Sequence, residues 1–195
     1  MSPGPAKQFE PDVALEKAMD LFWAHGYEAA SLSQLLDAMG IGRKSLYDTF
    51  GTKRDLFLKA LDHYGRTQVR QIRNELRAPG SPLGNLRRVL EGFEASHCQH
   101  RPGCMLATNV ANFTQNDEEV AAALRRHLES LTEAFAATLQ RAQAEGELRD
   151  DLDPTDTARL LLCATQGMAL LSRVMGHGQL HRSARGALML LLSER

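Results

Sequence analysis

Apolar side chains recur every three or four residues along most of this chain, which is the spacing of one face of an α-helix. The first such segment runs from Pro11 to Ala24 or His25 and stops at Gly26. Proline suits that position because the first turn of a helix does not use the missing N–H. Alternating runs typical of strands are absent, while Leu, Ala, Glu and Arg are abundant. The pattern therefore predicts an all-α protein.

Residues 31–54 are predicted to form two short helices joined by a tight turn. Ser31 is a good N-cap, because its hydroxyl accepts a hydrogen bond from a backbone N–H one turn into the helix. The apolar positions that follow share one face: Leu32, Leu35, Leu36 and Met39. Gly40 ends this helix, because glycine tolerates the left-handed backbone of a C-cap. Gly42 then opens the second helix.

The second short helix, residues 43–50, separates its apolar and polar side chains. Leu46 and Phe50 lie four residues apart and face the first helix. The side chains left on the outer face are Arg43, Lys44, Ser45, Tyr47 and Asp48. Arg and Lys reach phosphate oxygens and guanine edges, hydroxyls hydrogen-bond phosphates, and one helix fits the major groove. We expect Arg43, Lys44, Ser45 and Tyr47 to contact DNA, with Ser31 and Lys53 holding phosphates.

The overall charge of −1, from 23 basic and 24 acidic residues, conceals an uneven distribution. Between residues 39 and 73 the three acidic residues are Asp48, Asp55 and Asp62, against eight basic ones: Arg43, Lys44, Lys53, Arg54, Lys59, Arg66, Arg70 and Arg73. Such a block suits contact with phosphates. For the last three arginines a solvated helix surface is the simpler interpretation.

Six further helices are predicted from periodicity and caps. Thr52 is the expected N-cap of a long helix that connects two domains, and Asp117 that of another long helix ending near Gly146. The remaining predicted helices are residues 82–96, 104–113, 154–175 and 180–193. The expected organisation is a flexible arm (residues 1–8), a helix-turn-helix DNA-binding domain (residues 9–52) and an effector-binding and dimerisation domain (residues 53–195), with about nine helices in total.

The last two helices are the most apolar part of the chain. Residues 160–171 are hydrophobic nearly all round, so they need cover on several sides, and they are too short to cross a bilayer. A partner subunit is the expected cover, and the alternative is a large core within one chain. The predicted dimer interface consists of Leu161, Thr165, Met168, Leu170, Leu188 and Leu191.

Cysteine usage and motifs limit the chemistry. Three cysteines and no signal-peptide pattern indicate a cytoplasmic protein with reduced thiols. His97, Cys98, His100 and Cys104 offer zinc-type donors, but their spacing does not match paired zinc ligands. A redox switch between Cys98 and Cys104 remains an alternative.

No catalytic motif is present, so no enzyme activity, metal or cofactor is expected. A helical enzyme and a helical adaptor are the rival classes.

Residues 9–66 resemble the TetR family of bacterial transcriptional repressors. The segment ALEKAMDLFWAHGYEAASL is similar to that family's first helix and the Gly-Tyr turn after it, and SLYDTFGTKRDLFLKAL is similar to its recognition helix and connecting helix. The resemblance implies a homodimer that binds a palindromic double-stranded operator and is released by a small-molecule effector. It also implies a bundle formed by the last two helices of each protomer.

The resemblance further suggests where the effector binds. In several branches of the family a Gly-Cys segment begins a helix near the effector pocket, which implies effector contacts from Cys104, Met105, Thr108, Asn109 and Phe113. It also implies that the helix after Thr52 carries the movement of the effector-bound domain to the DNA-binding domain.

Overall fold

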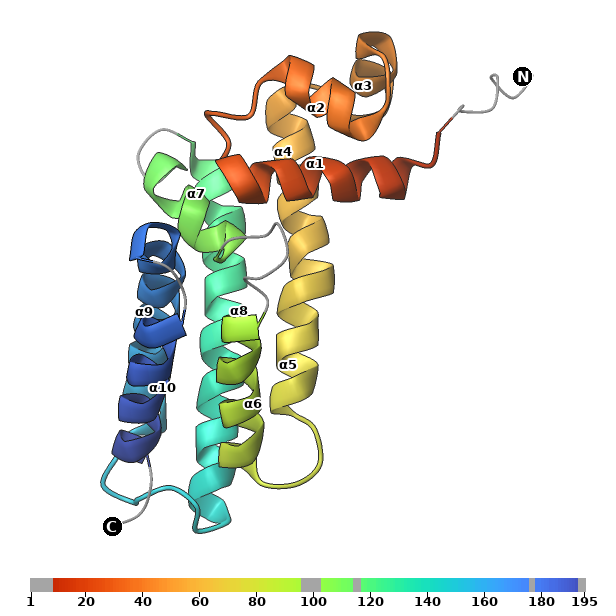
Figure 1. The fold of residues 1–195 in the computed structure, drawn as a ribbon. Coiled ribbons are helices and arrows are strands. Elements are labelled where there is room, and N and C mark those ends of the chain that lie inside the picture. The colour runs from red at the N-terminus through yellow and green to blue at the C-terminus, as the bar shows by residue number, and fades with distance from the viewer. Residues whose placement is uncertain (1–8, 96–102, 114–116, 176–177, 193–195) are drawn as a thin grey trace, which may run out of the picture.

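The computed structural model describes residues 9–95, 103–113, 117–175 and 178–192, without the side chains of residues 94–95 and 111–113. Figure 1 shows the helices in chain order. They are α1 (Pro11–His25), α2 (Leu32–Met39), α3 (Arg43–Phe50), α4 (Lys53–Tyr64), the π-helical turn η1 (Gly65–Val69), α5 (Arg70–Leu76), α6 (Pro82–Ala95), α7 (Met105–Phe113), α8 (Glu118–Ala144), α9 (Pro154–Met175) and α10 (Gly178–Leu192). The predicted all-α fold is confirmed.

The first three helices form a compact unit, called the head below. Ser31 caps α2 in the predicted way, because its Oγ accepts from the backbone N–H of Gln34 at 3.2 Å and the Gln34 side chain bonds back to the Ser31 N–H. Gly40 ends α2 with a left-handed φ of 68°. Leu46 and Phe50 of α3 are buried, as their spacing predicted.

One rod of helix joins the head to the rest of the molecule (Figure 1). It consists of α4, η1 and α5 without a break, and it is called the link helix (residues 53–76). Its first turns belong to the core of the head, where the rings of Phe22 and Phe57 meet edge to face with centroids 5.0 Å apart. The domain boundary between residues 52 and 53 stays a prediction, because this helix packs in both parts.

The π-helical turn brings the link helix against α8. A Cβ atom added at Gly65 would lie 2.1 Å from the Cε1 atom of His127, so the imidazole occupies the space that glycine leaves. Burial lowers the pKa of His127, with the neighbouring Arg126 lowering it further and Asp62 opposing them. The contact therefore fixes the link helix against the longest helix of the fold.

The body of the molecule (α6–α10) is built around α8 (Figure 1). Its 27 residues bury one stripe at helical spacing, including Leu131, Phe135 and Leu139, and α9 packs along it. Helices α6 and α10 complete the bundle. None of the described helices is long and apolar enough to span a membrane.

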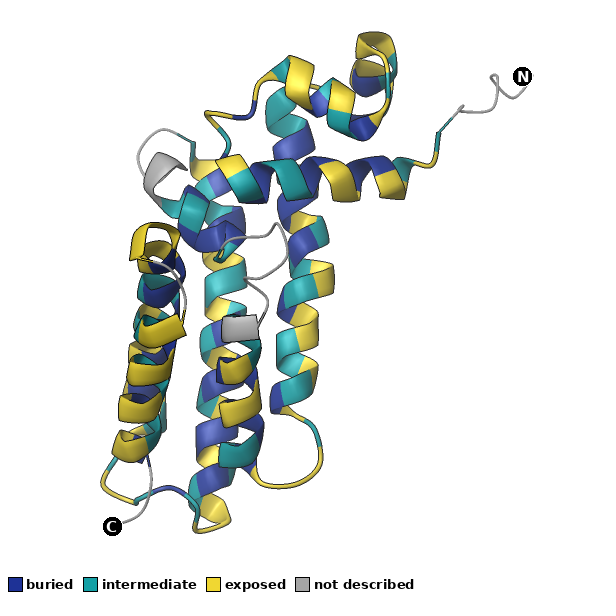
Figure 2. Cartoon of the chain, in the orientation of Figure 1, coloured by how far each residue is buried: buried dark blue, intermediate teal, exposed yellow. Residues whose placement is uncertain are grey.

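Much of the outer surface of α9 and α10 is exposed, as the yellow in Figure 2 shows, and several of the exposed side chains are apolar. We call this apolar set the α9–α10 face, and its members are Leu160, Leu170, Leu171, Val174, Met175, Leu190 and Leu191. Val174 has 89 % of its surface exposed.

Four of the six residues predicted to form the dimer interface are buried inside the protomer, and the interface itself stays a prediction. Leu161 is 1 % exposed, and Thr165, Met168 and Leu188 are also buried inside the protomer. A helix that is apolar on most sides does not reveal which side faces its own chain, and these four face inward. Leu170 and Leu191 are exposed and belong to the α9–α10 face.

Candidate DNA interface and ligand cavity

The outer face of α3 presents its polar side chains to solvent. Arg43 and Lys44 are exposed at the first turn, and Tyr47 is 47 % exposed one turn later. Leu46 and Phe50 hold the opposite side of α3 in the core of the head. No ion pair within the described residues involves Arg43 or Lys44. Both cations are therefore available to a nucleic acid.

The two residues predicted to hold phosphates lie at the surface of the head. Ser31 uses its oxygen as a helix cap and keeps a hydroxyl proton that can be donated. The Lys53 ammonium lies 4.4 Å from the centroid of the Tyr27 ring, a cation–π contact that orients it. Burial lowers the pKa of Lys53, an effect that the charge of Glu28 opposes.

The basic block counted from the sequence overstates the charge available to DNA. Arg54 is bound to Asp117 and Glu119, and the Lys59 ammonium donates to the backbone carbonyl of Phe50 at 3.2 Å. Arg66 and Arg70 are exposed, and Arg73 is half-buried, on the part of the link helix that runs away from the head (Figure 1). The cations on the outer face of α3 and Lys53 are what remain for recognition.

Arg54 joins the head to the N-terminus of α8. Its guanidinium donates to both oxygens of Asp117, at 2.5 and 2.7 Å, and to Glu119 at 2.7 Å. Asp117 also caps α8 by accepting from the N–H of Val120. These bonds, led by the one from Arg54, lower the pKa of Asp117 to about 2.

Three hydrogen bonds fix the end of α1 and the turn after it on the body. The Trp23 indole N–H donates to the carbonyl of Gly103 at 3.1 Å. The Tyr27 backbone N–H donates to the side-chain oxygen of Asn109 at 2.9 Å, and Arg173 donates to the carbonyl of Ala24 at 2.9 Å. The position of the head therefore depends on α7 and α9.

The predicted effector residues lie in different environments, and their contact with an effector stays a prediction. Met105 and Asn109 are fully buried, and the Asn109 amide is used by Tyr27 and by the Met105 carbonyl. Thr108 donates to the Cys104 carbonyl and accepts from Arg173, and it is not among the residues that line the cavity described below. Cys104 alone lines a cavity, while the Phe113 side chain lies outside the described part of the chain.

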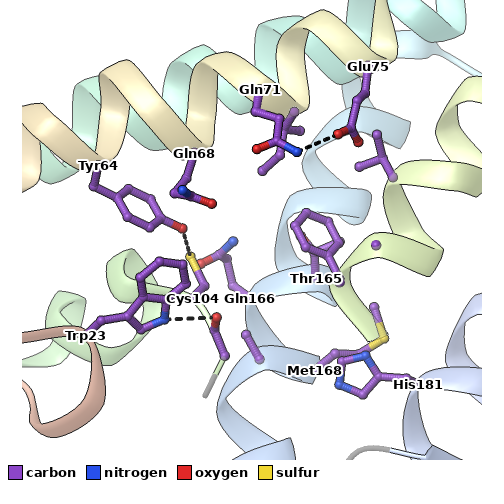
Figure 3. Close-up of a pocket in the computed structure, with 16 residues that line it drawn as sticks. Trp23, Tyr64, Gln68, Gln71, Glu75, Cys104, Thr165, Gln166, Met168 and His181 are labelled. Atoms are coloured by element: carbon purple, nitrogen blue, oxygen red, sulfur yellow. Dashed lines mark hydrogen bonds between the residues drawn. The ribbon is translucent and has the colours of Figure 1, made fainter. Parts of the chain in front are cut away.

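A cavity of about 110 Å³ lies between the link helix, α6, α9 and the end of α1 (Figure 3). Trp23 and Tyr64 form its aromatic end, with their rings edge to face and 5.0 Å between centroids. The Tyr64 hydroxyl and the Cys104 sulfur are 3.4 Å apart. Burial raises the pKa of Tyr64 well above its usual value, so the phenol is neutral.

The wall formed by the link helix is polar. Gln68, Gln71 and Glu75 point toward the cavity, and Gln71 donates to Glu75 at 2.9 Å. Sequence reasoning missed these residues, although Tyr64, Gln68, Gln71 and Glu75 follow one another at spacings of four, three and four, which places them on one helix face. Thr165 and Met168, two residues of the predicted dimer interface, also line this cavity.

The four-donor cluster suggested by the sequence falls largely on residues 97–100, outside the described residues. Cys104, its remaining member, contacts Tyr64. Among the residues that the structure places, no three His, Cys, Asp or Glu side chains converge as a metal site would require. The absence of a metal therefore stays a prediction.

Comparisons with known proteins agree with this geometry. Residues 14–60 match the family described as bacterial regulatory proteins, tetR family, and residues 82–188 match the tetracyclin repressor-like C-terminal domain. The uncharacterised transcriptional regulator YezE of Bacillus subtilis is 35 % identical over 88 % of this chain and 90 % of its own length. The transcriptional repressor ComR of Escherichia coli is 32 % identical over 88 % and 83 %, respectively.

A solved structure with the same fold contains DNA. It is a cysteine-substituted variant of the regulator CifR in complex with a 26-base-pair operator duplex, with a TM-score of 0.84 and 30 % identity. The alignment covers 95 % of this chain and 98 % of that one.

The Arg54–Asp117 contact predicts a specific response to acid. The pKa of Asp117 in the folded protein is about 2, below its ordinary value of 3.8, so the stability it contributes is present above pH 3.8 and is lost as the pH falls toward 2. Asp117→Asn keeps a capping oxygen but removes the charge. As the pH is lowered from 3.8 toward 2, we expect the urea concentration at the midpoint of unfolding to fall less steeply for this variant than for the parent. Asp150→Asn, at an exposed position, is the control, and equal slopes for Asp117→Asn and the parent would refute the assignment.

Proposed function

The chain belongs to the TetR family of bacterial regulatory proteins, and we propose that it is a homodimeric repressor that leaves its operator when a small molecule occupies the cavity. One observation carries the proposal. Trp23 is part of α1 in the head, and its ring is also a wall of the cavity. A ligand that moves this ring acts directly on the DNA-binding unit.

The exposed face of α3 supports the DNA-binding half of this function. Its free cations and hydroxyls match what the major groove offers, and Leu46 anchors the helix from behind. The similar regulator CifR was solved on operator DNA, and ComR is described as a repressor. The match to a family of regulators confirms the expectation that the chain is not an enzyme.

The α9–α10 face supports the dimer. Several exposed apolar side chains on two neighbouring helices favour an association surface. A two-fold dimer formed through this face would carry two heads, and two heads related by symmetry read a palindromic site.

Release from the operator follows because the head, the link helix and the body all contribute residues to the cavity. The link helix supplies Gln68 and Glu75 to the cavity and carries Lys53 at its start in the head. Trp23 and Gly103, which line the cavity, also form a hydrogen bond between head and body. A ligand that shifts these groups changes the orientation of the head and so lowers its affinity for the operator. Operator binding must then lower the affinity of the cavity for the ligand by the same factor.

The thiol alternative has one observation in its favour. The Cys104 sulfur lies in the cavity beside the Tyr64 hydroxyl. Its proposed partner, Cys98, lies outside the described residues, so a redox switch between the two stays a prediction.

We predict that Arg43 and Lys53 make different kinds of DNA contact. The operator is first identified by sequencing genomic fragments retained by the purified protein. Arg43→Ala should then reduce the free energy of binding to the operator by about 1–3 kcal/mol. The loss on a scrambled duplex should be much smaller, because a bidentate base contact depends on sequence. Lys53→Ala should weaken binding to both duplexes alike. It should also reduce the slope of the logarithm of the binding constant against the logarithm of salt concentration by about one unit per protomer.

Titrations of both variants on both duplexes at several salt concentrations measure this difference. Equal losses for Arg43→Ala on the two duplexes would show that it contacts phosphate, and base reading would move to Lys44, Ser45 or Tyr47. Failure to retain any specific genomic fragment would contradict the proposed function itself.

We also predict that the dimer depends on the α9–α10 face. Leu170→Glu places a charge in the proposed interface, where burying it without a partner is costly. We expect monomers or aggregates in analytical ultracentrifugation at concentrations where the parent is a dimer. Val13→Glu is the matched control, because Val13 is similarly exposed but lies on α1. A dimer of parental affinity in Leu170→Glu would exclude this interface.

A further inference from the structure

The cavity carries a negative charge that its own walls do not neutralise. Glu75 is the one acidic side chain among the described lining residues, and none of those residues is Lys or Arg. Its carboxylate accepts a hydrogen bond from the Gln71 amide at 2.9 Å, which orients it without cancelling its charge. None of the ion pairs formed within the described residues includes Glu75.

A second acceptor lies on α9. The side-chain oxygen of Gln166, another lining residue, is buried and has no hydrogen-bond partner among the described residues. Burying such an oxygen is unfavourable unless something donates to it. Figure 3 places Gln166 across the cavity from the link helix, on which Glu75 lies. The cavity thus presents one charged and one neutral acceptor on separate walls.

Gln68, Cys104, Thr165 and His181 also line the cavity, and the rest of the lining is apolar or aromatic. Its members include Ile72, Val89, Phe93 and Met168, and the rings of Trp23 and Tyr64 form the aromatic end. Aromatic faces attract cations because of their quadrupole. A cavity of about 110 Å³ is comparable to engineered cavities on the order of 150 Å³ that hold benzene. The space suits a body of about one ring.

From these observations we infer that the effector is a small organic cation, a protonated amine on an apolar body of about one ring. The ammonium donates to Glu75, a further N–H or O–H of the ligand satisfies Gln166, and the apolar body packs against the aliphatic and aromatic walls. A carboxylate of the same size would place a second negative charge beside Glu75, with no Lys or Arg among the described walls to offset it. This inference rests on the proposed function, in which the cavity is the effector site.

The test compares three probes of equal size and different charge. Benzylamine, benzyl alcohol and benzoate are titrated into the full-length protein by calorimetry. We expect benzylamine to bind about tenfold or more tightly than benzyl alcohol, because a hydrogen bond to a charged partner is stronger than a neutral one. Benzoate should bind weakest of the three.

A matched pair of variants assigns the preference to one residue. Glu75→Gln should remove the advantage of benzylamine and leave benzyl alcohol within about twofold of its affinity for the parent, which also shows that the variant is folded. Glu133→Gln, at an exposed position on α8, should behave as the parent does. The inference is overturned if benzylamine fails to bind at millimolar concentration, if benzoate binds as tightly as benzylamine, or if Glu75→Gln keeps the preference.

Release from the operator is measured separately with the same probes, so that the two proposals fail in different ways. If benzylamine binds through Glu75 but the operator stays bound, the cation site stands and the release mechanism is wrong. If benzyl alcohol or benzoate releases the operator and benzylamine does not, the release mechanism stands and the cation inference is wrong.

Discussion

The hydrogen bond from the Trp23 indole to the Gly103 carbonyl is the contact on which the rest of the arrangement depends. A buried indole N–H needs an acceptor, and this acceptor belongs to the segment that precedes α7. Gly103 is itself confined, because a Cβ atom there would lie 2.6 Å from the Ala169 carbonyl and its φ is 78°. The end of α1, the start of α7 and the middle of α9 are therefore held together at one point, beside the cavity.

The link helix provides the second connection between head and body. It packs in the core of the head through Phe57, contacts α8 at the π-helical turn, and lines the cavity with Glu75. Close packing of Gly65 on His127 leaves little freedom for the rod to bend there. In the release mechanism that we propose, a change in the cavity reaches the head as a shift of a stiff element, because packed interfaces convert small displacements into larger ones.

Local features of this fold could be predicted from the sequence, and features that depend on several helices could not. Ser31, Gly40 and Thr52 act where their chemistry predicted, because caps and turns involve neighbours in the chain. The cavity draws side chains from the head, the link helix and the body, so Glu75 and Gln166 looked like ordinary helix positions. The same limit explains why Leu161 was expected at the surface but is buried in the protomer. The sequence of a helix that is apolar on most sides does not indicate which side its own chain covers.

The most direct measurement of the central claim uses Trp23, the only tryptophan in the chain, as a reporter. Because its ring is shared by the head and the cavity, binding of DNA to the head must alter the surroundings of the ring if the two are coupled. We predict that the emission of Trp23 changes when the operator duplex is added without any effector and does not change with a scrambled duplex. An emission spectrum that stays the same while the operator is bound would contradict the account.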